Sequence, residues 1–178
     1  NTDGLDVRII RPFNVAGPRQ REEGGFVLPR FIRQAKAGEP LTVYTPGSQR
    51  RAFTHVLDIV DGIIRAATLG MPGEWYNLGN PDNECSIWDL AEEVRAVLGS
   101  ASDIAIVDPT TLWGPAFREA PDKVPAIDKA REQLAWEPRR TRREVIEDAA
   151  GWQSANVVSP VTTAAAHPVY PSSWLVEP

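Results

Sequence analysis

The spacing of apolar residues along the chain predicts a series of helices and strands. Helical spacing occurs in stretches that we expect to form helices at 26–37, 58–69, 86–98, 129–135 and 141–152. Runs rich in β-branched residues predict strands at 5–10, 41–45, 52–56, 74–78 and 103–107. From Gln153 onward neither period is present, and we expect 153–178 to be a disordered tail.

Polar residues at the ends of these stretches predict where helices begin. Ser86 and Asp89 resemble a capping box, and Thr141 with Glu144 forms a second one. Asp128 is expected to cap the helix at 129–135. In the helix at 58–69, apolar residues form one stripe, which comprises Ile59, Val60, Ile63, Ile64 and Ala67.

The first strand has no visible partner in the sequence. Val7, Ile9 and Ile10 predict a strand that is buried on both faces and stops at Arg11-Pro12, but nothing precedes it to pair with it or cover it. We therefore expect this strand to be unpaired. The strands at 41–45 and 52–56 flank a Pro-Gly turn, which predicts a hairpin or a paired crossing.

Composition narrows the classes of function. The chain has 178 residues, 42% of them hydrophobic, which is enough for one core and favours one domain. Its net charge of -5 argues against a nucleic-acid partner. The single Cys85 excludes an internal disulfide, no spacing suggests a metal site, and no apolar run is as long as a membrane span. These features favour a cytoplasmic protein.

Three motifs occur in order along the chain. The first is Arg11-Pro12-Phe13-Asn14-Val15-Ala16-Gly17-Pro18-Arg19-Gln20, and the second runs from Gly47 to Asp58 as G-S-Q-R-R-A-F-T-H-V-L-D. The third begins at Pro121-Asp122-Lys123 and closes with Trp136-Glu137-Pro138. Together they resemble the NAD-dependent epimerase/dehydratase family, the extended short-chain dehydrogenase/reductases that act on nucleotide sugars.

The resemblance covers about residues 5–152 and implies an α/β fold. It implies the C-terminal part of a Rossmann-type extended short-chain dehydrogenase, with the small mixed α/β substrate-binding domain. Residues 1–20 then end the Rossmann-type sheet and begin the substrate region, 21–152 form the nucleotide-sugar-binding domain, and 153–178 are the tail.

The resemblance also assigns two polar contacts with the substrate. Arg51 is expected to bind the pyrophosphate, because a guanidinium offers paired donors that lysine cannot. Its neighbour Arg50 faces the other way and is expected in solvent. Asn14 is expected to bind the sugar or its phosphate, although an Asn before Gly17-Pro18 also suits a turn.

Apolar contacts are implied in the same way. Val27 and Leu28, with Val43 and Tyr44, resemble the elements that enclose a uracil or thymine base, and core packing would use the same residue types. Phe13 resembles the residue whose backbone lies beside the nicotinamide of NAD.

In the third motif, Lys123 stands where many relatives have an arginine that contacts phosphate or, in decarboxylating members, the reacting sugar. Lysine keeps the charge but loses the bidentate geometry. Arg118 is a second candidate for that contact. In the second motif, His55 is expected to be packed and hydrogen-bonded, and Asp58 to cap a helix.

The family's catalytic Y-x-x-x-K pair and its Gly-rich NAD-binding turn do not occur in this sequence. We therefore expect no catalytic residues in the chain and no activity by the chain alone. Its partners would be a nucleotide-sugar substrate and a missing N-terminal half of the same enzyme, or a homo-oligomer partner.

Several reactions remain open. The motifs favour a sugar 4-epimerase, then a UDP-glucuronate decarboxylase or a sugar 4,6-dehydratase. A non-catalytic nucleotide-sugar-binding module and a purely structural domain are the alternatives from other classes.

Overall fold

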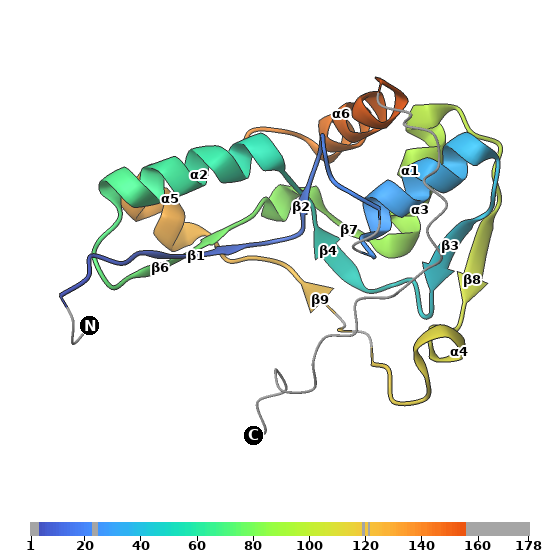
Figure 1. The fold of residues 1–178 in the computed structure, drawn as a ribbon, viewed down its shortest axis with the longest axis horizontal. Coiled ribbons are helices and arrows are strands. Elements are labelled where there is room, and N and C mark those ends of the chain that lie inside the picture. The colour runs from blue at the N-terminus through green and yellow to red at the C-terminus, as the bar shows by residue number, and fades with distance from the viewer. Residues whose placement is uncertain (1–3, 23–24, 119, 121, 156–178) are drawn as a thin grey trace.

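A computed structural model of the chain describes residues 4–22, 25–118, 120 and 122–155. Its elements form two groups at opposite ends of an elongated molecule (Figure 1). The first group comprises β1 (Ile9–Pro12), α2 (Val56–Leu69), β6 (Trp75–Leu78) and α5 (Asp128–Leu134). The second comprises α1 (Val27–Ala37), β3 (Leu41–Tyr44), α3 (Ile87–Leu98), β8 (Ile104–Val107) and α6 (Arg142–Ala155). Short elements lie between the groups: β2 (Val15–Ala16), β4 (Arg50–Ala52), β5 (Thr54–His55), a 3₁₀ turn (Pro81–Asn83), β7 (Glu84–Ser86) and β9 (Asp122–Lys123). The short helix α4 (Thr110–Trp113) follows β8.

The predicted helices are present, and two of the four predicted caps, Ser86 and Thr141, are confirmed. The Ser86 side chain accepts a hydrogen bond from Asp89 N, and the Asp89 carboxylate accepts one from Ser86 N. Thr141 and Glu144 exchange the same pair of bonds ahead of α6. Asp128 is not a cap, because Ile127 occupies that position and no side chain caps the helix there.

Helix α2 differs from its prediction in both its start and its buried face. It begins at Val56, because His55 Nδ1 accepts a hydrogen bond from Leu57 N and caps it. Of the predicted stripe, only Ile59 is buried, whereas Val60, Ile63 and Ile64 are 41–57% exposed. The helix therefore presents an apolar face that the described residues do not cover.

The strand pairing corrects two predictions. The first strand is paired, because β1 runs parallel to β6 in the register Ile9 to Trp75. Its outer side stays open, with Val7 44% and Ile9 49% exposed. The predicted hairpin is wrong, because β3 pairs in parallel with β8, while β4 pairs with β7 and β9.

Each group has its own core. The larger cluster unites α1, α3, α6 and β3, and the smaller one surrounds Tyr76, Leu78 and Trp136, all 0% exposed. Gly79 follows β6 and packs against Pro125 of the third motif. A Cβ added at this position would come within 2.4 Å of Pro125 Cγ. Within the described part of the chain, no helix combines the length and the apolar character that crossing a membrane requires.

Asp58 holds the third motif against the second. Its carboxylate, 3% exposed, accepts hydrogen bonds from the backbone N of Arg139 and of Arg140 at 3.1 and 3.0 Å. Oδ1 also pairs with the Arg140 guanidinium at 2.6 Å, and the Asp58 carbonyl accepts a bond from Trp136 Nε1 at 3.0 Å. Asp58 thus stabilises the packing of the segment at 136–140 against α2, and it is not the helix cap that its position in the sequence suggests. We call it a latch in this sense.

Cys85 is expected to be unreactive in the folded protein. It lies in β7, 3% exposed, and burial raises the pKa of its thiol from 9.0 to about 11. At pH 8 such a thiol has about 100-fold less of the nucleophilic thiolate than an ordinary one. A disulfide reagent that reports free thiols should react slowly with native protein and rapidly after denaturation, and equal rates would contradict this burial.

Candidate functional site

A cavity of about 290 Å³ lies between α1, β3 and β4 and contains most of the predicted site. Its walls comprise Asn14, Gly25, Phe26, Val27, Arg30, Tyr44, Gln49, Arg51, Phe53, Ile87 and Lys123. Three of these residues are cationic and none is acidic, in a chain whose net charge is -5. We call it the cationic cavity. Positive charge beside aromatic and aliphatic walls suits a ligand with a base at one end and phosphates at the other.

Arg51 lies in the wall of this cavity. Strand β4 places its side chain on the buried side, 6% exposed, while Arg50 faces solvent and pairs with Glu84, as predicted for these two neighbours. The Arg51 guanidinium donates to the carbonyls of Arg50 and Ala120, each at 2.8 Å. These bonds hold the planar group in one orientation at the cavity wall.

Asn14 lies within the first motif, between β1 and β2, and beside β4 and β9. Its backbone is left-handed, with φ of 37°, a conformation that asparagine tolerates. Nδ2 donates to the carbonyls of Ala52 and Lys123, each at 3.2 Å. Asn14 therefore joins the first and third motifs and reaches the cavity from the point where they meet.

Tyr44 and Val27 line the cavity, and so do two residues that sequence reasoning missed, Arg30 and Gln49. The Arg30 guanidinium lies 4.4 Å from the centre of the Tyr44 ring and donates to Thr42 O at 3.1 Å. The helical period holds the signal for Arg30, since it lies three positions after Val27 and so on the same face of α1.

Other candidates lie away from the cavity. Leu28 and Val43 are 1% and 0% exposed and pack in the larger core. Arg118 donates to the carbonyls of Pro115 and Phe117 in its own loop. Phe13 donates from its N to Leu78 O and lines neither this cavity nor the neighbouring one. Val27, Tyr44 and Lys123 line the cavity and are therefore better candidates for ligand contacts than these four residues.

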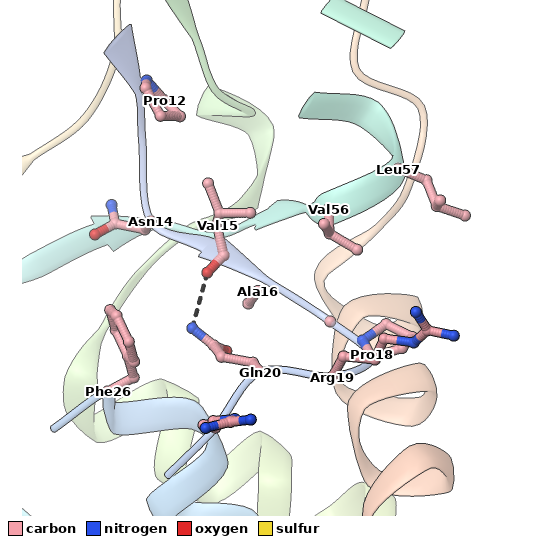
Figure 2. Close-up of a pocket in the computed structure, with 12 residues that line it drawn as sticks. Pro12, Asn14, Val15, Ala16, Pro18, Arg19, Gln20, Phe26, Val56 and Leu57 are labelled. Atoms are coloured by element: carbon pink, nitrogen blue, oxygen red, sulfur yellow. Dashed lines mark hydrogen bonds between the residues drawn. The ribbon is translucent and has the colours of Figure 1, made fainter. Parts of the chain in front are cut away.

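A second cavity, of about 890 Å³, adjoins the first at Asn14 and Phe26, which line both. Figure 2 shows its wall, which follows the first motif from Pro12 to Gln20 and continues to Val56 and Leu57 at the start of α2. Gln20 Nε2 donates to Val15 O at 2.9 Å and holds the turn in this wall. This mostly apolar cavity extends to the exposed side chain of Leu57 in the first turn of α2.

NAD does not fit the described residues as a whole molecule. A dinucleotide needs a Gly-rich turn between a strand and a helix to hold its pyrophosphate. The parallel strands β1, β3 and β5 are followed by no such turn. Among the described residues there is also no cluster of three or more side chains suited to a metal ion.

Comparison with known proteins supports the motif assignment. Residues 1–79 match the model of the NAD dependent epimerase/dehydratase family. UDP-glucuronic acid decarboxylase 3 of Arabidopsis thaliana is 41% identical over 141 residues, which are 79% of this chain and 39% of the relative. UDP-N-acetyl-alpha-D-glucosaminuronate decarboxylase of Bacillus cytotoxicus is 35% identical over 151 residues, 84% of this chain and 46% of the relative.

The fold of this chain is also similar to that of a solved structure. The UDP-glucuronic acid 4-epimerase of Bacillus cereus, in complex with UDP-glucuronic acid and NAD, aligns with a TM-score of 0.75 and 25% identity, over 85% of this chain and 46% of the other. This chain thus spans less than half the length of each of these proteins. The chain thus matches the NAD-dependent epimerase/dehydratase family over residues 1–79, and its α/β fold and its similarity to these relatives agree with that match.

Proposed function

We propose that this chain is the nucleotide-sugar-binding part of an NAD-dependent enzyme that decarboxylates a UDP-linked uronic acid. The observation that carries the proposal is the cationic cavity, where Arg30, Arg51 and Lys123 line one space without an acidic neighbour in its wall. A nucleotide sugar brings two phosphate charges, and the sugar acid brings a carboxylate, so its bound form needs this excess of positive charge.

The cavity geometry supports one direction for the ligand. The base would lie at Tyr44 and Val27, and the diphosphate at Arg51. The sugar would then extend past Asn14, which borders both cavities, toward the apolar cavity. Lys123, next to Asn14 through its carbonyl, would face the phosphate or the sugar carboxylate.

A decarboxylase is preferred over the 4-epimerase that the motifs alone favour. The two relatives described above are decarboxylases of UDP-linked uronic acids, at 41% and 35% identity, whereas the aligned 4-epimerase is 25% identical. The 4-epimerase stays the second candidate, since its structure was solved with UDP-glucuronic acid and shares the fold. Both reactions would use the same substrate cavity.

The uncovered apolar surface indicates where a further part of the enzyme would pack. The outer side of β1 and the open face of α2 carry Leu5, Ile9 and Ile64, which are 64%, 49% and 57% exposed. We propose that an NAD-binding, catalytic part of the enzyme covers this surface and supplies the reacting groups. The present chain would then contribute substrate binding alone.

The chain without such a part is expected to bind nucleotide sugar but not to convert it. Calorimetric titration should detect binding of UDP and of UDP-glucuronic acid that weakens as salt rises, because ionic contacts are screened. In the presence of NAD and UDP-glucuronic acid, the chain should neither form NADH nor release carbon dioxide. Turnover by the purified chain, or the lack of any nucleotide binding, would refute the proposal.

A further inference from the structure

Gln49 carries a polar atom that the folded chain leaves unsatisfied at the cationic cavity. The side chain lies in the cavity wall and the residue is 6% exposed. Its Oε1 is buried and accepts no hydrogen bond, one of few such side-chain atoms in the described part of the chain. Buried polar atoms are nearly always paired, so an unpaired one at a cavity indicates a partner that binds there.

The orientation of the Gln49 amide is fixed by Tyr44. Gln49 Nε2 donates to Tyr44 O at 3.3 Å. The opposite orientation would place Oε1 against that carbonyl, and two acceptors repel each other. The amide therefore keeps its oxygen as the group offered to a ligand, and the ligand must supply a hydrogen-bond donor.

Tyr44 also identifies which part of a ligand would bring this donor. Its ring and Ile87 line the cavity, and the planar Arg30 guanidinium lies 4.4 Å from the ring centre, so this part of the wall offers flat surfaces on which a base would stack. Uracil and thymine carry a hydrogen on ring nitrogen N3, whereas cytosine has a lone pair there. Gln49 lines the same cavity as Tyr44 and Ile87, so a base stacked there would lie beside its amide and could supply the missing partner of Oε1.

We propose that Gln49 selects the base of the nucleotide by accepting a hydrogen bond from the N3–H of uracil or thymine. The inference rests on the proposed function, because it assumes that a nucleotide occupies the cationic cavity. Gln49 would be a specificity residue, and the unpaired oxygen of the ligand-free chain would become paired when the correct base binds.

The variant Gln49→Leu tests the assignment, with Gln34→Leu as a matched control. Gln34 is also a glutamine at 6% exposure, but its amide is fully paired with Thr42 and it does not line the cavity. Gln49→Leu should leave the melting temperature unchanged or raise it, since Tyr44 O keeps its bond from Gly47 N and the unpaired oxygen is removed. Gln34→Leu should lower the melting temperature, because it leaves Thr42 unpaired.

The binding readout is calorimetric titration of the full chain with UDP, 3-methyl-UDP and 2′-deoxy-UDP. The unsubstituted chain should bind UDP about 10-fold more tightly than 3-methyl-UDP, the effect of one hydrogen bond, and bind 2′-deoxy-UDP as tightly as UDP. Gln49→Leu should weaken UDP binding about 10-fold and abolish the discrimination against 3-methyl-UDP, and Gln34→Leu should retain that discrimination.

Equal affinities for UDP and 3-methyl-UDP in the unsubstituted chain would overturn the role of Gln49 while leaving nucleotide binding intact. A loss confined to 2′-deoxy-UDP would overturn it too, because the donor would then be a ribose hydroxyl. No binding of any of the three nucleotides would instead refute the proposed function itself.

Discussion

Replacing Asp58 with alanine is expected to lower the free energy of unfolding by about 3 kcal/mol, the lower end of the range for breaking a buried ion pair. The carboxylate accepts hydrogen bonds from the backbone N of Arg139 and Arg140 as well as from the Arg140 guanidinium. Its removal leaves these two partly buried backbone donors without their acceptor. Arg140 is partly exposed, so water would relieve part of the cost.

Thermal unfolding followed by circular dichroism measures this effect. For a domain of this size, about 3 kcal/mol corresponds to a fall in Tm of roughly 10 °C. Asp61→Ala is the matched control, because Asp61 lies on the same helix and pairs with Arg65 at the surface, where such pairs contribute about 0.5 kcal/mol. If the two variants melted at similar temperatures, Asp58 would not be a latch.

The second large effect is expected for Arg51→Lys, which should weaken UDP binding by about 10- to 100-fold. The substitution keeps the positive charge but loses the planar pair of donors, and one charge-assisted hydrogen bond contributes about 1.5–3 kcal/mol. Arg51 is buried at the cavity and its orientation is fixed by two backbone carbonyls, so lysine cannot restore the geometry.

Arg50→Ala is the control for this variant. Arg50 is the adjacent cation in β4, but it faces solvent and pairs with Glu84, so its loss should change UDP affinity less than twofold. Titration calorimetry measures both variants, and a thermal melt of each confirms folding. Equal losses for Arg51→Lys and Arg50→Ala would mean that β4 contributes only general positive charge.

Part of the site could be predicted from the sequence, because the direction of a side chain depends on its immediate neighbours in the strand or helix. Alternation along β4 correctly separates the buried Arg51 from the exposed Arg50, since neighbouring side chains of a strand face opposite sides. His55 is packed and hydrogen-bonded, as expected, with Nε2 3.1 Å from Asp148. The proposed cavity contacts Asn14, Val27 and Tyr44 stay predictions about ligand binding. The predicted tail at 153–178 is wrong at its start, because residues 153–155 belong to α6, and 156–178 lie outside the described residues.

Other features depend on contacts between distant segments. The motifs assign no ligand contact to Arg30 or Gln49. These residues line the same cavity because the tertiary structure brings α1 and the segment around Tyr44 together. Leu28 and Val43 look like ligand contacts in sequence but are needed by the core. Apolar residue types suit a core and a base pocket equally, so sequence alone cannot separate them.

The sequence by itself determines the family resemblance, the capped starts of α3 and α6, and the presence of Arg51 and Lys123 at the cavity. These properties are local, because capping, side-chain alternation and motif spacing act over a few residues. Only the tertiary structure decides that β1 pairs with β6, that β3 pairs with β8 instead of forming a hairpin, and that Asp58 latches the segment at 139–140. Strand partners and buried polar contacts join residues far apart in the chain, and many pairings satisfy the same local pattern until packing selects one.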